Sequence, residues 1–272
     1  MREMPASGEG LLIDYGDGVL SITLDRPDRR NAITDQQVLT LIDLVEVAGS
    51  DETVRVIRLG GTGDHFCSGF DLSLRGGGQG TKPRVGTTQR QMRWHVNRLV
   101  TSMLETQTPI VCAVKGWAIG LGLNLALASD FAVVADDARL LAPFTKAGFT
   151  PDSGGSWMLP RLVGVTRAKE MIMLGRTIEG ALAADWGMVH RAVPVADVDA
   201  TADALVDELI GAATVSVGLS KLLILRAATS ELERHLEDEG WAIELSSRSE
   251  DFHEAGRAGA TGATRTSRGA EP

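Results

Sequence analysis

Apolar and polar residues partly alternate in two short segments near the start of the chain, residues 10–15 and 18–24. This period of two is typical of half-buried strands, and the Gly-Asp-Gly turn between the segments predicts a hairpin. Farther on, Thr34 precedes apolar residues at helical spacing up to about Val47, which predicts a helix with Thr34 as its N-cap. Residues 54–59 then form a β-branched strand. Strand, helix and strand in this order predict an α/β domain with right-handed crossovers.

The later part of the chain is more helical. The expected elements are a mobile, glycine-rich loop at 74–89, a helix at 90–105, a buried strand at 111–114, helices at 168–174, 181–186, 196–213 and 219–247, and a strand at 188–195. This shift predicts a boundary near residue 200, between a core of residues 1–200 and a helical region of residues 201–255. Residues 256–272 have almost no large apolar side chains, which predicts a disordered tail.

The most informative segment runs from the buried strand at 111–114 to the Gly-Gly pair at 154–155. Gly120-Leu121-Gly122 opens an apolar helix there. Free amides are therefore expected at a helix N-terminus, where an anion or a developing oxyanion is stabilised. Other glycine motifs do not fit, because Leu125 stands where a dinucleotide fingerprint needs its third glycine, and the chain has neither a phosphate loop nor a G-x-S-x-G elbow.

Composition narrows the class of protein. The chain has 272 residues, a formal net charge of −9 and a pI near 5.1, which argue against a nucleic-acid or anionic-membrane surface as the main partner. Cys67 and Cys112 are the only cysteines, and their spacing suggests neither a disulfide nor a metal site. The first residues lack an apolar signal core, and no apolar run approaches membrane-spanning length. We therefore expect a cytoplasmic enzyme.

Three blocks of sequence resemble the signatures of the crotonase, or enoyl-CoA hydratase/isomerase, superfamily. They run from Leu24 to Ala32, from Gly61 to Leu72 and from Lys115 to Ala126, and the resemblance extends over roughly residues 10–255. It implies an α/β fold built as a spiral of ββα units, with a C-terminal helical region that packs in trimers or dimers of trimers. It also implies a coenzyme A thioester as the substrate, with no other cofactor.

The resemblance further implies the residues of the site. Two backbone amides, those of Phe70 and Leu121, would hold the thioester oxygen. Contacts with the acyl group or coenzyme A would come from residues around these turns and from one basic residue, namely Arg29, Ser68, Gly69, Asp71, Leu72, Gly120, Asn124, Pro143 and Phe144. Three of these have competing interpretations. Asn124 could equally make a polar contact that stabilises its helix. Asp71 is also well placed to bind local backbone amides, and Arg29 to belong to a solvated charge run.

Two positions depart from the pattern of the hydratases. Where the resemblance expects two glutamates that add water, this chain has Asn124 and Phe144. Neither side chain is a general acid or base, and water addition depends on that proton transfer. The sequence therefore disfavours ordinary hydratase activity.

One acid remains close by in sequence, Asp152 in Thr150-Pro-Asp-Ser-Gly-Gly155. Its position is similar to that of the aspartate that shuttles a proton in dienoyl-CoA isomerases and acts as nucleophile in 4-chlorobenzoyl-CoA dehalogenases. The combination of Asn, Phe and Pro-Asp-x-Gly-Gly most resembles isomerases of the 1,2-epoxyphenylacetyl-CoA type, which are similar in reaction to Δ3,Δ2-enoyl-CoA isomerases. We favour Asp152 as the single base of a 1,3-proton shift, although it could instead cap the following helix.

Several alternatives stay open. The chain could be a hydratase with other acids, an enzyme that uses Asp152 as a nucleophile, or a non-catalytic acyl-CoA binding protein. His95 lies in the helix after the glycine-rich loop and is a weaker candidate for the acyl pocket than for packing. The histidines show no metal-ligand spacing, so no metal is expected.

Overall fold

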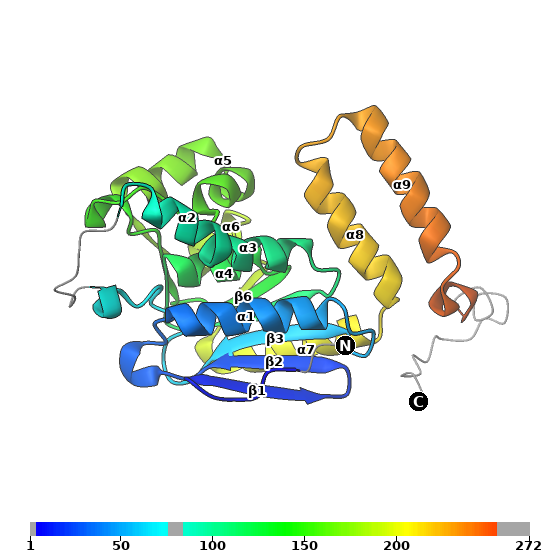
Figure 1. Cartoon of the computed structure of the whole chain (residues 1–272), viewed down its shortest axis with the longest axis horizontal. Helices are drawn as coiled ribbons and strands as arrows, with labels where there is room; N and C mark the ends of the chain where they lie inside the picture. Colours follow the sequence, from blue (N-terminus) through cyan, green and yellow to red (C-terminus); the bar gives the residue numbers. More distant parts are fainter. Residues whose placement is uncertain (1–3, 76–83, 255–272) are drawn as a thin grey trace.

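A six-stranded sheet forms the centre of the computed structural model, which describes residues 4–75 and 84–254 (Figure 1). Its strand order is β1-β2-β3-β4-β6-β9, with β1 antiparallel to β2 and every other neighbouring pair parallel. The strands are β1 (Leu11–Gly16), β2 (Val19–Leu24), β3 (Val56–Gly61), β4 (Ile110–Val114), β6 (Phe131–Ala135) and β9 (Arg191–Val193). The predicted hairpin and the α/β architecture are confirmed.

A second sheet of three short strands lies beside the carboxyl end of β4. It has the order β5-β7-β8, and β5 runs parallel to β7. Its strands are β5 (Trp117–Ile119), β7 (Arg139–Leu141) and β8 (Thr177–Glu179). The chain passes from β4 into β5 within three residues, so the two sheets meet at the segment that carries the third signature block.

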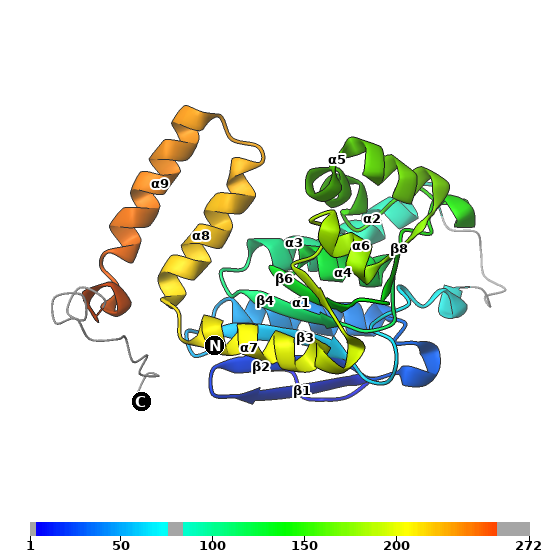
Figure 2. The same ribbon diagram turned by 180° about the vertical axis from the view of Figure 1, so that it is seen from behind.

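Helices cover both faces of the large sheet. On the face seen in Figure 1, α1 (Asp35–Ala48) packs against α3 (Val96–Glu105). On the opposite face, α7 (Val198–Ile210) contacts β3, β4 and β6 (Figure 2). Thr34 caps α1 as predicted, because its hydroxyl accepts from the Gln37 amide while the Gln37 side chain accepts from the Thr34 amide.

The remaining helices surround the site region and the carboxyl end. They are α2 (Thr87–Trp94), α4 (Leu121–Ala128), α5 (Gly155–Leu174), α6 (Gly180–Asp185), α8 (Thr214–Ala227) and α9 (Leu232–Ser246), with short 3₁₀ turns at Pro27–Arg29, Leu72–Arg75, Thr145–Ala147 and Val195–Asp197. Every residue of α4 is buried, so this helix forms the centre of the fold near the site.

Three predicted helices are wrong in their bounds. The helix expected at 168–174 is the end of α5, which begins at Gly155. The single helix expected at 90–105 is two helices, α2 and α3, which meet at His95 with ψ near −111°. The single helix expected at 219–247 is the antiparallel pair α8 and α9, separated near Thr229 and Ser230, and α8 begins five residues earlier than expected. The expected loop at 74–89 ends sooner, because α2 starts at Thr87. Residues 76–83 of that loop and the predicted tail lie outside the described residues.

The α8–α9 pair stands apart from the two-sided sheet, and both views show it projecting away from the core (Figures 1 and 2). Within the described part of the chain, α8 buries only Gly218 and α9 buries no residue. No single described helix is both long and apolar enough to cross a membrane, and only Val195–Ile210 with Thr214–Ala227, bent by 110°, satisfies those criteria as a pair.

Candidate active site

The loop after β3 is fastened to the loop after β2 by a buried asparagine. The Asn31 side chain donates to the carbonyls of Thr62, at 2.9 Å, and His65, at 2.7 Å, and accepts from the Arg26 amide at 2.8 Å. A buried amide group with all these partners fixes the two loops relative to each other. The first and second signature blocks are therefore held together before any ligand binds.

The turn at Gly69 and Phe70 pairs with the segment at Ile33. The Ile33 amide donates to the Gly69 carbonyl, and the Asp71 amide donates to the Ile33 carbonyl, both at 2.8 Å. Because polar groups of successive residues in an extended segment point to opposite sides, the Phe70 amide is directed away from Ile33. Gly69 has φ of 96°, and an added Cβ there would lie 2.7 Å from the Ile119 carbonyl oxygen. This turn therefore requires glycine.

The second turn lies directly against the first. A Cβ on Gly69 would lie 3.6 Å from the Leu121 nitrogen, and a Cβ on Gly122 would lie 2.5 Å from the Cys67 carbonyl oxygen. Leu121 is the first residue of α4, where an amide has no acceptor within its own helix. The structure thus brings the Gly69–Phe70 turn and the start of α4 together, with the helix dipole adding positive charge at that point.

Asn124 joins α4 to the turn that carries Asp152. Its Nδ2 donates to the Asp152 carbonyl at 3.0 Å, while its own amide donates to Gly120 at 3.0 Å. Asn124 is almost completely buried, and its Oδ1 has no hydrogen-bond partner among the described residues. Asp152 is half-buried, and one of its carboxylate oxygens accepts from the Ser153 hydroxyl at 2.9 Å. Asp152 is therefore linked to Asn124, the fourth residue of α4. The first amide of the same helix, that of Leu121, lies close to Gly69.

Pro143 and Phe144 form one wall of the second turn. A Cβ on Gly120 would lie 3.9 Å from the Pro143 ring and 4.0 Å from the Phe144 ring. Phe144 is buried and Pro143 half-buried. The ring of Phe144 therefore makes this wall of the turn apolar. A carboxylate at the same place would have to give up its hydration.

Asp71 has local partners for both carboxylate oxygens. One oxygen accepts from the hydroxyl and the amide of Ser73, and the other lies 2.9 Å from an Arg26 nitrogen. The Ser73 hydroxyl, followed by the Arg26 guanidinium, lowers the pKa of Asp71 below its ordinary value. Leu72, the next residue, is exposed. The carboxylate of Asp71 thus holds the end of the signature turn in place.

Ser68 and Arg29 lie at the outer edge of the first turn. The Ser68 hydroxyl donates to the Arg29 carbonyl at 3.1 Å, and the Ser68 amide donates to the Arg30 carbonyl at 2.9 Å. The Arg29 side chain is exposed. The Arg29 guanidinium therefore lies beside the turn and forms no ion pair with any of the described residues.

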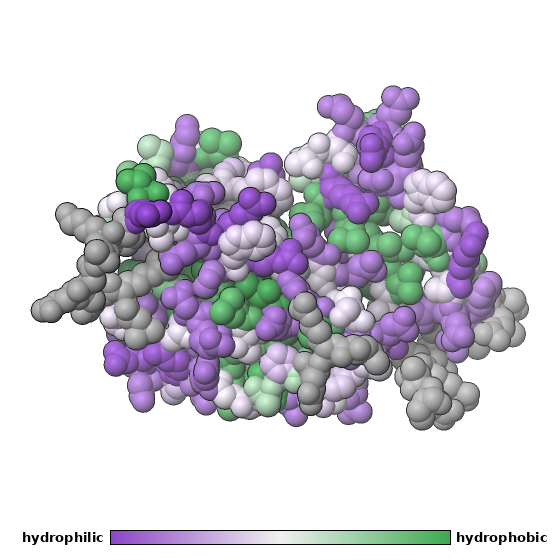
Figure 3. All heavy atoms as spheres, in the orientation of Figure 1, coloured by the Kyte–Doolittle hydropathy of each residue, from purple (hydrophilic) through white to green (hydrophobic). Residues whose placement is uncertain are grey.

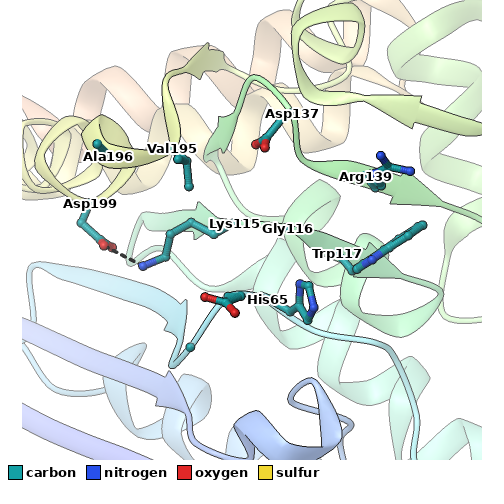
Figure 4. Close-up of a pocket in the computed structure, with 11 residues that line it drawn as sticks. His65, Lys115, Gly116, Trp117, Asp137, Arg139, Val195, Ala196 and Asp199 are labelled. Carbon is teal, nitrogen blue, oxygen red and sulfur yellow. Dashed lines mark hydrogen bonds and ion pairs between the residues drawn. The ribbon is translucent and has the colours of Figure 1, made fainter.

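A polar pocket of about 580 Å³ lies at the carboxyl ends of β3 and β4 (Figure 4). Its cations already have partners, because Lys115 Nζ lies 2.9 Å from an Asp199 oxygen and the Arg139 guanidinium stacks 5.6 Å from the centre of the Trp117 ring. None of the residues predicted for the site lines this pocket. We therefore do not assign it to the acyl group.

A more apolar groove of about 540 Å³ lies next to the Asp152 turn. Its lining comes from α3, the start of α5 and the end of α8, and includes Val100, Leu104, Gly154, Trp157 and Leu225. Gly154 lies two residues after Asp152. None of the residues predicted for the site lines this groove either, but it offers apolar surface next to the turn that carries the acid.

Sequence reasoning missed residues whose role depends on tertiary contacts. One such residue is Asn31, which lies inside the first signature block. It is buried and has φ of 55°, a conformation that asparagine adopts more often than most residues do. His95, a weaker candidate, separates α2 from α3 and lies 3.5 Å from an Asp35 oxygen. No group of three or more His, Cys, Asp or Glu side chains in residues 4–75 and 84–254 is arranged to hold a metal ion.

Comparisons with known proteins identify the family of the chain. Residues 14–258 match the family model described as enoyl-CoA hydratase/isomerase. The chain is 34% identical over 247 residues to 1,2-epoxyphenylacetyl-CoA isomerase of Escherichia coli (strain K12), covering 90% of this chain and 93% of that protein. It is 30% identical over 233 residues to 4-chlorobenzoyl coenzyme A dehalogenase-1 of Arthrobacter sp, covering 86% and 84%. The solved structure of an enoyl-CoA hydratase from Bacillus anthracis matches with a TM-score of 0.87 at 28% identity, covering 96% of this chain and 100% of that one.

Proposed function

Because the chain belongs to the enoyl-CoA hydratase/isomerase family, we propose that it is an acyl-CoA isomerase that moves a proton along an enoyl thioester with one acid–base residue. The observation that carries this proposal is the 3.0 Å bond from Asn124 Nδ2 to the Asp152 carbonyl. It ties the turn that carries Asp152 to α4, the helix whose first amide is proposed to bind the oxyanion.

The thioester oxygen is held by the amides of Phe70 and Leu121. The contact of Gly69 with the start of α4 supports this assignment, because it puts the two turns side by side. Two amides and a helix N-terminus stabilise negative charge on that oxygen, which makes the proton on Cα more acidic. The side chains at both positions are free to vary, since the backbone provides the donors.

Asp152 carries the proton. Its carboxylate removes a proton from Cα of a 3-enoyl thioester, and the electron pair moves onto the thioester oxygen to give a dienolate. The protonated Asp152 then returns the proton to Cγ, the double bond moves into conjugation, and the carboxylate is regenerated. One base is enough for this shift, and no water is consumed.

The two substituted positions favour isomerisation over hydration. A carboxamide and a phenyl ring are not acids or bases near neutral pH, so neither Asn124 nor Phe144 moves a proton between substrate and water. A hydratase would need other acids close to the start of α4. We assign the substrate class as an apolar or aromatic enoyl thioester, since the groove next to the Asp152 turn presents Val100, Leu104, Trp157, Met158 and Leu225. Arg29 lies where it can pair with a phosphate of coenzyme A.

A paired assay of the wild type, Asp152→Asn and Asp137→Asn tests the proposal. Each protein is given a 3-enoyl-CoA, and the conjugated 2-enoyl thioester is followed by its absorbance, with crotonyl-CoA hydration measured in parallel. Removal of a general base lowers the rate by about 10²- to 10⁴-fold, so Asp152→Asn is expected to lose isomerisation while it still binds the thioester. Asp137 lines the polar pocket of Figure 4 and is exposed, so Asp137→Asn is the matched control and is expected to keep full activity.

The other outcomes identify the alternatives. A covalent adduct on Asp152, found by mass spectrometry, would replace proton transfer by nucleophilic chemistry, the reaction type that the dehalogenase relative suggests. Hydration that survives in Asp152→Asn would point to other acids. Tight thioester binding without any turnover by the wild type, across short, branched and aromatic acyl groups, would make the chain a binding protein.

A further inference from the structure

A buried thiol lies between the two turns of the proposed oxyanion hole. Cys67 precedes Ser68 in the second signature block and is completely buried. Its amide donates to the Trp117 carbonyl and its carbonyl accepts from the Ile119 amide, both at 2.9 Å. The backbone of Cys67 is therefore bonded to β5, the strand that leads into Gly120 and Leu121.

The Cys67 sulfur also contacts the first turn. The Gly69 amide donates to Sγ at 3.3 Å, a normal length for a hydrogen bond to sulfur. The Cys67 thiol also donates to the Gly69 carbonyl at 3.9 Å. That carbonyl and the Phe70 amide belong to the same planar peptide unit, so the position of the carbonyl sets the direction of the Phe70 amide. A bond that fixes one also restrains the other.

The same sulfur contacts the second turn. A Cβ on Gly122 would lie 2.9 Å from Sγ and 2.7 Å from the Cys67 Cβ, so the backbone of Gly122 packs directly on this side chain. Gly122 follows Leu121, the residue that provides the second amide. The Cys67 sulfur thus contacts both Gly69 and Gly122. These are the sequence neighbours of Phe70 and Leu121, the two residues whose amides form the proposed hole.

We propose that Cys67 is a positioning residue, whose sulfur sets the separation and direction of the Phe70 and Leu121 amides. The inference rests on the proposed oxyanion hole and concerns what builds it. Burial raises the pKa of the Cys67 thiol to about 12, so the group stays neutral and adds no charge next to the developing oxyanion. Its part is geometric, and a displacement of about 1 Å in a catalytic group costs on the order of 10²-fold in rate.

Cys112 provides a matched control. It is the other buried cysteine, and burial raises its thiol pKa to about 12 as well. It lies on β4, where its thiol interacts with the Ser129 side chain and, electrostatically, with Arg58 and Cys67. Truncation of either cysteine leaves a cavity of similar size in the same core, but only the change at Cys67 removes a contact of the hole.

The test compares Cys67→Ala, Cys67→Ser and Cys112→Ala with the wild type in two measurements. The first is kcat and KM for the 3-enoyl-CoA. The second is the red shift in absorbance of a bound conjugated aryl thioester, cinnamoyl-CoA, which reports how strongly the amides polarise its carbonyl.

We expect Cys67→Ala to lower kcat by about tenfold to a hundredfold with KM changed less than threefold, and to reduce the red shift. Cys112→Ala is expected to keep both within twofold of the wild type at a similar loss of thermal stability. Cys67→Ser, which retains an acceptor on a shorter side chain, is expected to lie between Cys67→Ala and the wild type.

Each result decides one point. If Cys67→Ala keeps the wild-type kcat and red shift, as Cys112→Ala does, the positioning role is wrong while the oxyanion hole stands. If the wild type binds cinnamoyl-CoA with no red shift, the oxyanion hole itself is wrong, and this inference is overturned with it. If Cys67→Ala does not fold, the same two readouts on Cys67→Ser decide the matter.

Discussion

Asn124 restrains Asp152 through the backbone, so its effect on the reaction is separate from proton transfer. Its Nδ2 bonds to the Asp152 carbonyl, which also accepts from the Gly155 amide at 3.0 Å. Asn124→Ala therefore leaves that carbonyl with a partner but frees the turn from α4. The carboxylate can then move relative to the bound thioester.

We expect Asn124→Ala to lower kcat by about tenfold to a hundredfold, because the base is less well oriented. The lost buried hydrogen bond is expected to cost about 1 kcal/mol of stability. Steady-state isomerisation and urea unfolding measure the two effects. Isomerisation at the wild-type rate in Asn124→Ala would mean that Asp152 does not depend on this bond.

Asn124→Asp tests the same contact with a side chain of the same shape. The donor is replaced by an acceptor that faces the Asp152 carbonyl, and a charge is placed at a buried position. This variant is expected to be less stable than Asn124→Ala, since an unpaired buried charge costs more than a missing bond.

Sequence patterns could predict which residues of the site belong together, but not how they are held. The resemblance identifies Gly69, Phe70 and Leu121, since each lies within a continuous block of signature sequence. The contacts of Cys67 join segments about 50 residues apart, and that of Asn124 spans 28 residues. Such contacts depend on the fold and leave no periodic signal in the chain.

At the scale of elements, a nearly buried ion pair anchors α8 to the sheet. Lys221 Nζ lies 2.8 Å from Asp130 Oδ2 and donates to the Thr108 carbonyl at 3.2 Å. The same Asp130 oxygen accepts from the Ile110 amide at the start of β4. Burial raises the pKa of Asp130 and lowers that of Lys221, so desolvation opposes both charges. Each ion therefore depends on the other being present.

Lys221→Met is expected to destabilise the protein by about 3 kcal/mol, because it leaves the partly buried Asp130 carboxylate, whose side chain is 21% exposed, without its counter-ion. The double variant Lys221→Met with Asp130→Asn is expected to recover most of that loss. Denaturant unfolding of the two single variants and the double variant gives the coupling energy.

A surface pair provides the control for this cycle. Arg176 and Glu170 form an ion pair in which the Arg176 side chain is 61% exposed. Arg176→Met is expected to change stability by less than about 1 kcal/mol. A loss as small as this in Lys221→Met would contradict the anchoring role of the buried pair.

Elements with strong local signals were predictable, and elements set by tertiary contacts were not. The helix α1 has a capping box and a regular apolar stripe, and its expected and observed bounds agree within one or two residues. The break at His95 has no proline or glycine to mark it. The break between α8 and α9 falls in a run whose helical spacing continues across Thr229 and Ser230. The three-residue strands β5, β7 and β8 are too short to show a period.

At the scale of the whole molecule, periodicity predicted an α/β protein but could not order its strands. The sequence gives no local reason why β5 leaves the large sheet while β6 returns to pair with β4. The resemblance supplied the spiral of ββα units, but not this order of strands. The division near residue 200 stays a prediction, and α7 on the far side of it packs against β3, β4 and β6.

The projecting α8–α9 pair exposes large apolar side chains. Ile224 is 75% exposed and Trp241 is 69% exposed, and a groove of about 550 Å³ runs between the two helices. In the space-filling view, apolar residues gather over this part of the molecule (Figure 3). Contiguous apolar surface of this kind is typical of an interface between proteins. It supports the trimer that the resemblance implies, in which second and third copies cover the pair.

We therefore expect the wild type to have a mass of three or six times the chain mass of 28.9 kDa in light scattering coupled to size exclusion. The double variant Ile224→Arg with Trp241→Arg is expected to shift toward the monomer at micromolar concentration, because two charges would have to be desolvated at the interface. Leu12→Arg, an exposed apolar position on β1, is the control and is expected to keep the wild-type mass. Circular dichroism of the double variant must show the wild-type helix content for the shift to report assembly. A monomeric wild type at the same concentration would contradict the trimer and leave the exposed pair for another partner.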